Sequence, residues 1–195
     1  MQFGVVLGVF ALIFVAELPD KTMIATLILG SRNRPVLVWI GATAAFGLHA
    51  AVAVLAGRLL ALLPHVWVEA VTALLFAGGA VYLLVVSEED EEAEGGAEVA
   101  AAPAGLRPVA TAFVVIFVGE FGDLTQILTA NLAAKYHDPL SVFVGAFAAL
   151  ATVGALAAVG GRALLRVLPL GAIRRAGGVL LAGLAVYTLV TLIRS

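Results

Sequence analysis

The chain has 195 residues, of which 63% are hydrophobic and 12% charged, with a mean hydropathy of +1.12 and a formal net charge of −2. Soluble domains usually carry about a quarter charged residues, so this composition excludes an ordinary soluble protein. The chain contains no cysteine, which excludes disulfides, thiolate metal sites and thiol catalysis.

Six long apolar runs follow one another along the chain, at about 3–29, 36–63, 67–86, 108–133, 140–168 and 172–193. Each run is long enough to cross a hydrocarbon core of about 30 Å as a helix. The strands of a membrane β-barrel would alternate polar and apolar residues, and these runs do not. The predicted fold class is therefore an all-α polytopic membrane protein with six transmembrane helices.

An acidic stretch at 87–107 separates the third run from the fourth. Its acidic residues are Glu88, Glu89, Asp90, Glu91, Glu92, Glu94 and Glu98. Like charges in a row repel one another and bury no core, so we expect a disordered, solvated linker. A cation-collecting or regulatory segment is the alternative.

The regions on either side of this linker resemble each other at a nearly constant offset. Gly41 matches Gly145, and Ala80-Val81-Tyr82 matches Ala185-Val186-Tyr187. We therefore divide the chain into a first three-helix repeat (1–86), the acidic linker (87–107) and a second three-helix repeat (108–195). Because each repeat has an odd number of spans, the second must enter the membrane in the opposite orientation. Such inverted repeats are common in secondary transporters, whose sites lie near the membrane midplane.

The basic residues predict the orientation in the membrane. One face would carry Arg32, Arg34, Arg107, Arg162, Arg166, Arg174 and Arg175, and the other only Arg58, Lys135 and Arg194. Because cytoplasmic loops are enriched in Lys and Arg, the first face is predicted to be cytoplasmic, which puts the linker inside and both termini outside.

Four acidic residues lie near the centres of the first and fourth runs, in two copies of the pattern Glu-x-x-Asp-x-Thr. They are Glu17, Asp20, Glu120 and Asp123. An ionised acid at the centre of a membrane costs at least about 2.5–3.5 kcal/mol on insertion scales. Protonation, a basic partner or a bound cation must offset that cost.

The spacing suggests how these acids act together. Residues at i and i+3 share one helix face, so each Glu and its Asp would point the same way. Pro19 and Gly122 stand between the acids, and both residue types loosen a helix and free carbonyl oxygens. Oxygen ligands suit Ca²⁺, Mn²⁺ or Mg²⁺. The predicted metal ligands are Glu17, Asp20, Thr22, Glu120, Asp123, Thr125 and Gln126. The alternative is that the acids only satisfy each other or cap broken helices.

Two other polar residues in the spans, Lys21 and His49, have two interpretations each. Lys21 would pair with a neighbouring carboxylate, or act as a tethered cation that competes with a substrate ion. His49 would make a hydrogen bond between helices, or serve as a proton relay or ligand. Thr129 and Asn131 are candidates for lining a pathway. Gly41, Ala45, Gly145 and Ala149 are predicted to form close helix-packing seams.

The paired motifs resemble the E-x-G-D-[KR]-[ST] signature of the GDT-type cation transporter family, which has Golgi, chloroplast and bacterial members. The resemblance covers essentially the whole chain and implies transport of Mn²⁺ and/or Ca²⁺ in exchange for protons, with manganese export in bacteria. It implies acidic ligands at Glu17, Asp20, Glu120 and Asp123 and hydroxyl ligands at Thr22 and Thr125. Pro19 and Leu124 depart from the signature.

We therefore expect a divalent cation/proton antiporter that is not an enzyme, has no cofactor, and binds Mn²⁺ or Ca²⁺ as its substrate. Its partners would be the lipid bilayer, the cation and protons, without nucleic acid, and a homo-oligomer remains open. We expect a multi-pass protein of a bacterial plasma membrane. The alternatives are an exporter of another cationic solute, such as a basic amino acid, and a non-transporting membrane assembly factor. An intramembrane aspartyl protease fits the repeated spacing of the acids least well.

Overall fold

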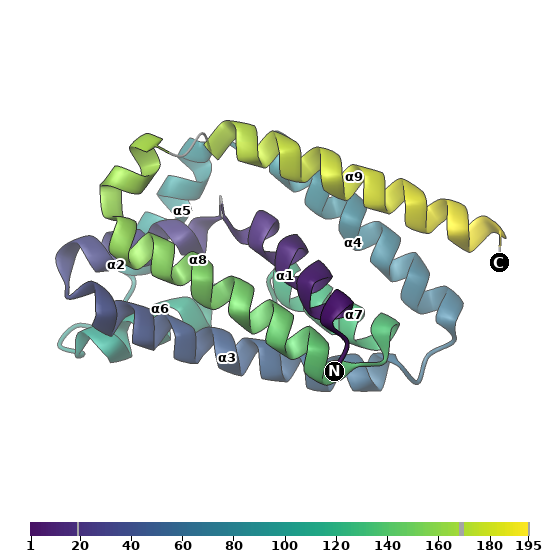
Figure 1. The fold of residues 1–195 in the computed structure, drawn as a ribbon. Coiled ribbons are helices and arrows are strands. Elements are labelled where there is room, and N and C mark those ends of the chain that lie inside the picture. The colour runs from purple at the N-terminus through teal and green to yellow at the C-terminus, as the bar shows by residue number, and fades with distance from the viewer. Residues whose placement is uncertain (19, 168–169, 195) are drawn as a thin grey trace.

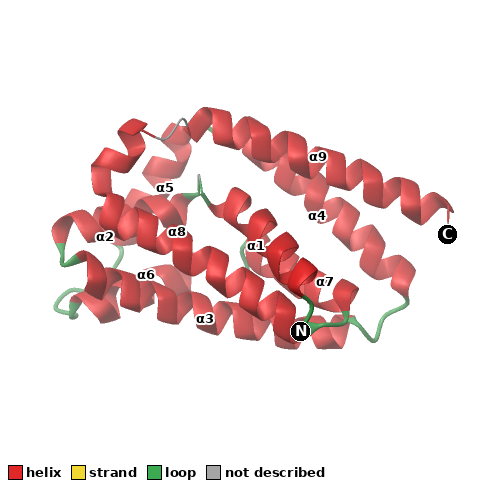
Figure 2. Cartoon of the chain, viewed as in Figure 1, coloured by secondary structure: helices red, strands yellow, loops and turns green. Residues whose placement is uncertain are grey.

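The computed structural model describes residues 1–18, 20–167 and 170–194, and in these ranges every regular element is a helix (Figures 1 and 2). In chain order the helices are α1 (Phe3–Glu17), α2 (Lys21–Arg32), α3 (Pro35–Leu60), α4 (His65–Val85), α5 (Glu88–Ala100), α6 (Pro108–Gly119), α7 (Leu124–Tyr136), α8 (Pro139–Val167) and α9 (Leu170–Arg194). The predicted all-helical class is confirmed. Pro19, one of the two departures from the family signature, lies outside the described residues.

The described residues provide four to six candidate membrane spans. Helices α3 and α4, together with Pro139–Gly160 of α8 and Gly171–Ile193 of α9, are each long and apolar enough to cross a bilayer. The pairs α1–α2 and α6–α7 reach that length only together, and each pair is bent by 72°. The predicted number of six therefore holds if each bent pair counts as one span.

Each bend falls inside one copy of the acidic motif. Helix α1 ends at Glu17 and α6 at Gly119, while Asp20 and Asp123 adopt extended backbone conformations as the N-caps of α2 and α7. In the second copy, Gly122 has a φ of +83°, a left-handed conformation that glycine adopts without a steric penalty. The prediction that Glu and Asp share the face of one continuous helix was therefore wrong, because they lie on opposite sides of a helix break.

The two halves pack on each other reciprocally. Helices α1 and α2 lie against α8, α6 and α7 lie against α3, and α4 runs along α9 (Figure 1). A Cβ on Gly41 of α3 would come within 2.2 Å of the Val109 carbonyl oxygen of α6, and one on Gly145 of α8 within 2.6 Å of that of Val6 in α1. Ala45 and Ala149 are fully buried on the same two helices. These contacts confirm the predicted small-residue seams.

The acidic stretch contains an ordered helix, so the prediction of disorder was wrong for residues 88–100. The side chains of Ser87 and Asp90 form a reciprocal capping box at the start of α5. Glu91 is buried and pairs with Arg174 of α9, while Glu94 and Glu98 pair with Lys21 of α2. Cationic partners from two other helices thus offset the repulsion on which the prediction of disorder rested.

The capping box gives a test of how α5 is stabilised. Ser87→Ala should remove about 1 kcal/mol of helix stability, because the hydroxyl that satisfies the Asp90 amide is lost. Hydrogen exchange of the amides of residues 88–100 should become faster by the factor that corresponds to this loss of free energy. Ser31→Ala is the control, because the Ser31 hydroxyl only bonds the Ile28 carbonyl near the end of α2.

The same contact has a defined pH dependence. Hydrogen bonds from Ser87 hold the pKa of Asp90 below its ordinary value of 3.8. A lowered pKa in the folded state means that the contact is fully present above the ordinary value and is lost as the pH falls through the lowered one. Unchanged exchange in Ser87→Ala near neutral pH would show that the cap does not hold α5.

Candidate metal centre

Three acidic side chains from both halves of the chain meet at the helix breaks. Glu17, Asp20 and Glu120 each offer a carboxylate oxygen, and these oxygens all lie within 4.8 Å of one another. The three residues are 1%, 7% and 4% exposed. Because residues from both copies of the motif contribute, only the packing of one half on the other forms this cluster.

The two motif threonines reach across to the acid of the other copy. The Thr22 hydroxyl donates a hydrogen bond to Glu120 Oε1, and the Thr125 hydroxyl interacts with the Glu17 carboxylate. The backbone turns are also alike, since the amides of Asp20 and Asp123 each donate to the carbonyl of the preceding motif glutamate at 3.2 Å. The Thr22 hydroxyl therefore restrains Glu120 from the opposite half.

Two oxygens of the cluster have no donor. Among the described residues, Glu17 Oε1 and Asp20 Oδ2 are buried without a hydrogen-bond partner. Buried polar groups are rarely left unsatisfied, and an unsatisfied charged group costs more than the roughly 1–3 kcal/mol of a neutral one. A cation or a proton would supply the missing interaction, and the donor set of carboxylate and hydroxyl oxygens suits a hard divalent cation.

The fourth motif acid, Asp123, lies beside the cluster rather than in it. Its carboxylate accepts a hydrogen bond from the Thr125 amide at 3.2 Å, so it caps α7. Asp123 and Asp20 line a cavity of about 50 Å³ together with Thr125 and Tyr82. The predicted ligands Asp20 and Asp123 therefore share a cavity, but the structure gives them different local roles.

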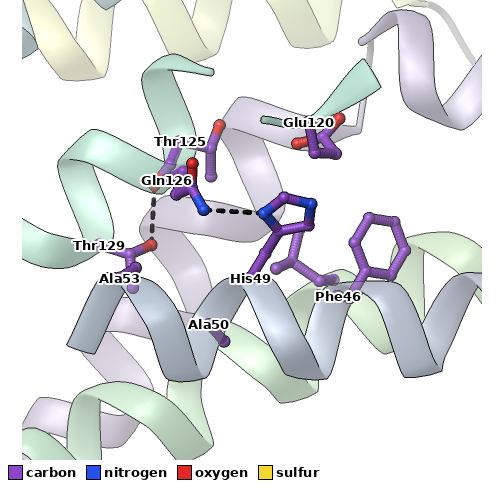
Figure 3. A pocket seen from close by; sticks show the side chains of 9 residues that line it. Phe46, His49, Ala50, Ala53, Glu120, Thr125, Gln126 and Thr129 are labelled. Atoms are coloured by element: carbon purple, nitrogen blue, oxygen red, sulfur yellow. Dashed lines mark hydrogen bonds between the residues drawn. The ribbon is translucent and has the colours of Figure 1, made fainter. Parts of the chain in front are cut away.

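A second, smaller cavity borders the cluster on the side of α3 (Figure 3). Its volume is about 10 Å³, close to the lower limit for one water molecule. His49, Glu120, Thr125, Gln126 and Thr129 contribute its polar lining. Thr129, predicted as a pathway residue, thus borders the cluster, whereas Asn131 hydrogen-bonds with Thr72.

His49 and Gln126 satisfy each other at this cavity. Gln126 Nε2 lies 2.8 Å from His49 Nδ1, and His49 Nε2 lies 3.0 Å from the Phe117 carbonyl oxygen (Figure 3 shows the first contact). A ring that donates from Nε2 and accepts at Nδ1 is the neutral tautomer that fits both contacts. The amide oxygen of Gln126, predicted as a ligand atom, accepts from the Gly122 amide at 2.8 Å. The structure thus gives His49 the interhelical hydrogen bonds of its first interpretation.

Lys21 finds its ion-pair partners outside the cluster. Its ammonium lies 2.9 Å from Glu94 and 3.7 Å from Glu98, both on α5. Burial raises the pKa of Glu98, and the charge of Lys21 opposes that shift. These two ion pairs of Lys21 therefore link α2 to the acidic helix α5.

Sequence reasoning missed two residues next to the cluster. The Tyr82 hydroxyl lies between Asp20 and Glu91, and Glu91 belongs to the stretch predicted to be solvated. The pattern Ser87-x-x-Asp90 could have indicated a helix start, but nothing local shows that Glu91 turns inward. Its burial depends on Arg174, which is distant in sequence.

The fold and this site define a helical membrane protein with a buried cluster of carboxylates between its helices. The sequence profile of the family described as "Divalent cation/proton antiporter GDT1" matches residues 5–91 and 108–195. The chain belongs to this family, whose members are membrane transporters. The family resemblance seen in the two motifs is thereby confirmed.

Individual relatives are similar at about 30% identity. Protein PAM71 of Arabidopsis thaliana chloroplasts is 31% identical over 94% of this chain and 56% of its own length. A putative manganese exporter of Vibrio cholerae is 34% identical over 87% of this chain and 84% of its own. A GDT1-like protein of Synechocystis is 29% identical over 77% and 80%. The chain thus spans only about half the length of the chloroplast relative. No solved structure matches this chain.

The crossed threonine contacts can be tested by removing one hydroxyl. Thr22→Val keeps the side-chain shape but deletes the donor to Glu120, so the affinity for Mn²⁺ should fall by about three- to tenfold, as expected for one hydrogen bond. Titration calorimetry on purified protein measures this affinity. Thr26→Val, one turn further along α2, is the control because the buried Thr26 hydroxyl has no hydrogen-bond partner in the described part of the chain. Equal losses in both variants would contradict the assigned role of Thr22.

Proposed function

We propose that this protein is a secondary transporter that moves Mn²⁺ and/or Ca²⁺ across a membrane in exchange for protons. One observation carries the proposal: buried carboxylates from two halves of the chain converge, and two of their oxygens have no donor among the described residues. A site of this kind requires a positive charge when its acids are ionised. Membership of a family of divalent cation/proton antiporters supports the same activity.

Glu17, Asp20 and Glu120 are the proposed core ligands, with Thr22, Asp123 and Thr125 completing the site. In the cation-bound state the carboxylates are ionised and the cation neutralises them. In the cation-free state protons take that role, because several ionised carboxylates this close together repel one another strongly in a low-dielectric interior. Cation and protons therefore exclude each other, which is the basis of exchange. Gln126 contributes by restraining the Gly122 turn and His49.

The two halves are proposed to be inverted repeats that alternate access by rocking. The reciprocal packing of α1–α2 on α8 and of α6–α7 on α3 supports this arrangement. The site lies at the breaks of both bent pairs, where such repeats place substrate sites. The proposed units are the first repeat (1–86), the acidic segment (87–107) and the second repeat (108–195).

The ligand chemistry favours a metal ion over a larger solute. The two cavities beside the cluster measure about 50 Å³ and 10 Å³, room for an ion with a few waters but not for a basic amino acid. Oxygen donors suit Mn²⁺ and Ca²⁺ alike. The similarity to a putative manganese exporter supports Mn²⁺ as the substrate and export as the direction.

The location proposed for the protein is a bacterial plasma membrane with both termini outside. In Figure 1 the marked termini lie towards the right of the view, and α2 and α5 lie on the left. The arginine-rich loops beside α2 and α5 would then face the cytoplasm. The bacterial relatives support this setting, whereas chloroplast relatives show that the family also occurs in other membranes.

Flux measurements test the transport function. In proteoliposomes with a pH gradient, the wild-type protein should carry Mn²⁺, and Glu17→Gln and Glu120→Gln should reduce the flux to that of empty liposomes. Each substitution removes one charge but keeps the shape and a hydrogen-bond acceptor. Glu69→Gln is the matched control, because Glu69 lies in the first turns of α4, away from the cluster, and its carboxylate pairs with His65.

The results separate the candidate functions. Equal Mn²⁺ flux in wild type and in both glutamate variants would overturn the assignment of the site. Transport of a basic amino acid that Mn²⁺ does not inhibit would favour the exporter of another solute. Loss of a partner complex in the variants, with unchanged cellular manganese, would favour an assembly factor.

A further inference from the structure

Asp20 is connected to the acidic helix through a single hydroxyl group. Tyr82 Oη of α4 lies 2.7 Å from Glu91 Oε1 and 3.4 Å from Asp20 Oδ1. A tyrosine hydroxyl has one hydrogen to donate, so at any moment it donates to one of these carboxylates. At these distances the bond to Glu91 is the stronger one and the contact with Asp20 is at the long limit. Tyr82 therefore lies between a core ligand and α5.

Glu91 is itself held firmly in place. It is 1% exposed, and the Arg174 guanidinium of α9 lies 3.3 Å from Oε1, the same oxygen that Tyr82 contacts. Arg174 also donates to the Val86 carbonyl at 2.8 Å, immediately before α5. Buried charges of this kind need a partner with good geometry, since removing one partner leaves an uncompensated charge. The position of Glu91 is thus coupled to α9 and to the start of α5.

Helix α5 also contacts the first motif directly. A Cβ on Gly95 would lie 2.6 Å from the Lys21 carbonyl oxygen, so the two backbones touch beside the N-cap Asp20. The Lys21 ammonium adds its ion pairs to Glu94 and Glu98. A movement of α5 would therefore displace Lys21, the residue next to Asp20. It would also act on Asp20 through Tyr82.

The described residues of the second half show no equivalent of this connection. Tyr187 is the sequence counterpart of Tyr82, but it is 67% exposed. Asp123, the counterpart of Asp20, accepts its hydrogen bond from the Thr125 amide within its own motif. Repeat symmetry alone therefore does not explain the contacts of Tyr82. They exist because the acidic helix α5 packs against α2 of the first half.

We propose that Tyr82 and Glu91 are positioning residues of the cation site, which hold the Asp20 carboxylate for the cation and couple it to the docking of α5. This inference rests on the proposed cation transport. When the Tyr82 hydroxyl donates to Asp20 Oδ1, it restrains the carboxylate and leaves Oδ2, which has no donor among the described residues, for the ion. When the hydroxyl donates to Glu91 instead, this restraint on Asp20 is released. If α5 moves away, the restraint on Asp20 is lost. The Asp20 carboxylate is then no longer held in place for the cation.

Transport kinetics of Tyr82→Phe provide the first test, with Tyr187→Phe as the matched control. Removing the Tyr82 hydroxyl should raise the KM for Mn²⁺ by about three- to tenfold, the effect of one hydrogen bond, with a smaller change in kcat. Tyr187→Phe should leave both constants unchanged. A Tyr82→Phe protein with wild-type KM would overturn the proposal. So would a variant whose loss lies entirely in kcat or in the amount of folded protein, because a purely structural role predicts that result.

A double substitution tests whether Glu91 acts through Tyr82. Glu91→Gln retains an oxygen that can accept from the tyrosine but loses the charge beside Arg174. If both residues act on Asp20 by one route, the double variant should raise the KM no further than the larger of the single effects. Fully additive effects on KM would show that Glu91 does not act through the hydroxyl.

Cysteine labelling tests the coupling to α5 without any transport. The chain has no cysteine, and Val99 of α5 is partly buried against the main core, so Val99→Cys gives a unique reporter of docking. Maleimide labelling of this reporter should be faster when Tyr82→Phe is added and unchanged when Tyr187→Phe is added. Equal rates in both backgrounds would overturn the coupling. Because labelling needs no cation flux, a failure of the transport function and a failure of this inference give different results.

Discussion

Burying several carboxylates in one place is the constraint on which the rest of the structure depends. Carboxylate oxygens of Glu17, Asp20 and Glu120 come within 4.8 Å of one another inside a helical bundle, while the nearby Lys21 pairs with Glu94 and Glu98 of α5. The Thr22 hydroxyl restrains Glu120, but among the described residues Glu17 Oε1 and Asp20 Oδ2 remain without donors. Such a cluster is stable only with a neutralising cation or proton, so the same feature that makes the site costly makes it suitable for exchange.

The helix breaks allow the acids of the two motifs to meet in this cluster. A continuous helix would satisfy its backbone internally and spread the side chains of each motif along one face. At a break, the end of α1 or α6 meets the start of α2 or α7, and each aspartate becomes the N-cap of the following helix. The positive end of a helix dipole favours a carboxylate there. Reciprocal packing then brings the two breaks together.

The site is built from both halves of the chain but is not symmetric. In the second half, Asp123 caps its own helix, and Gln126 ties the Gly122 turn to His49. In the first half, Asp20 contacts Tyr82, and α5 supplies Glu91, Glu94 and Glu98 to residues around it. The segment that joins the halves thus distinguishes them, and it does so through ion pairs that reach from α5 to α2 and α9.

The sequence by itself determined the helical membrane class and the residues of the cluster, because long apolar runs and repeated mid-span acids are local patterns. The contacts of Gly41 and Gly145 were likewise predictable from small residues at matching positions. Only the tertiary structure decided which acids meet, that α5 is ordered, and that Tyr82 and Glu91 border the site. Those outcomes depend on contacts between residues that are distant in sequence, such as the hydrogen bond from Thr22 to Glu120 and the ion pair of Arg174 with Glu91. No local sequence pattern encodes such contacts.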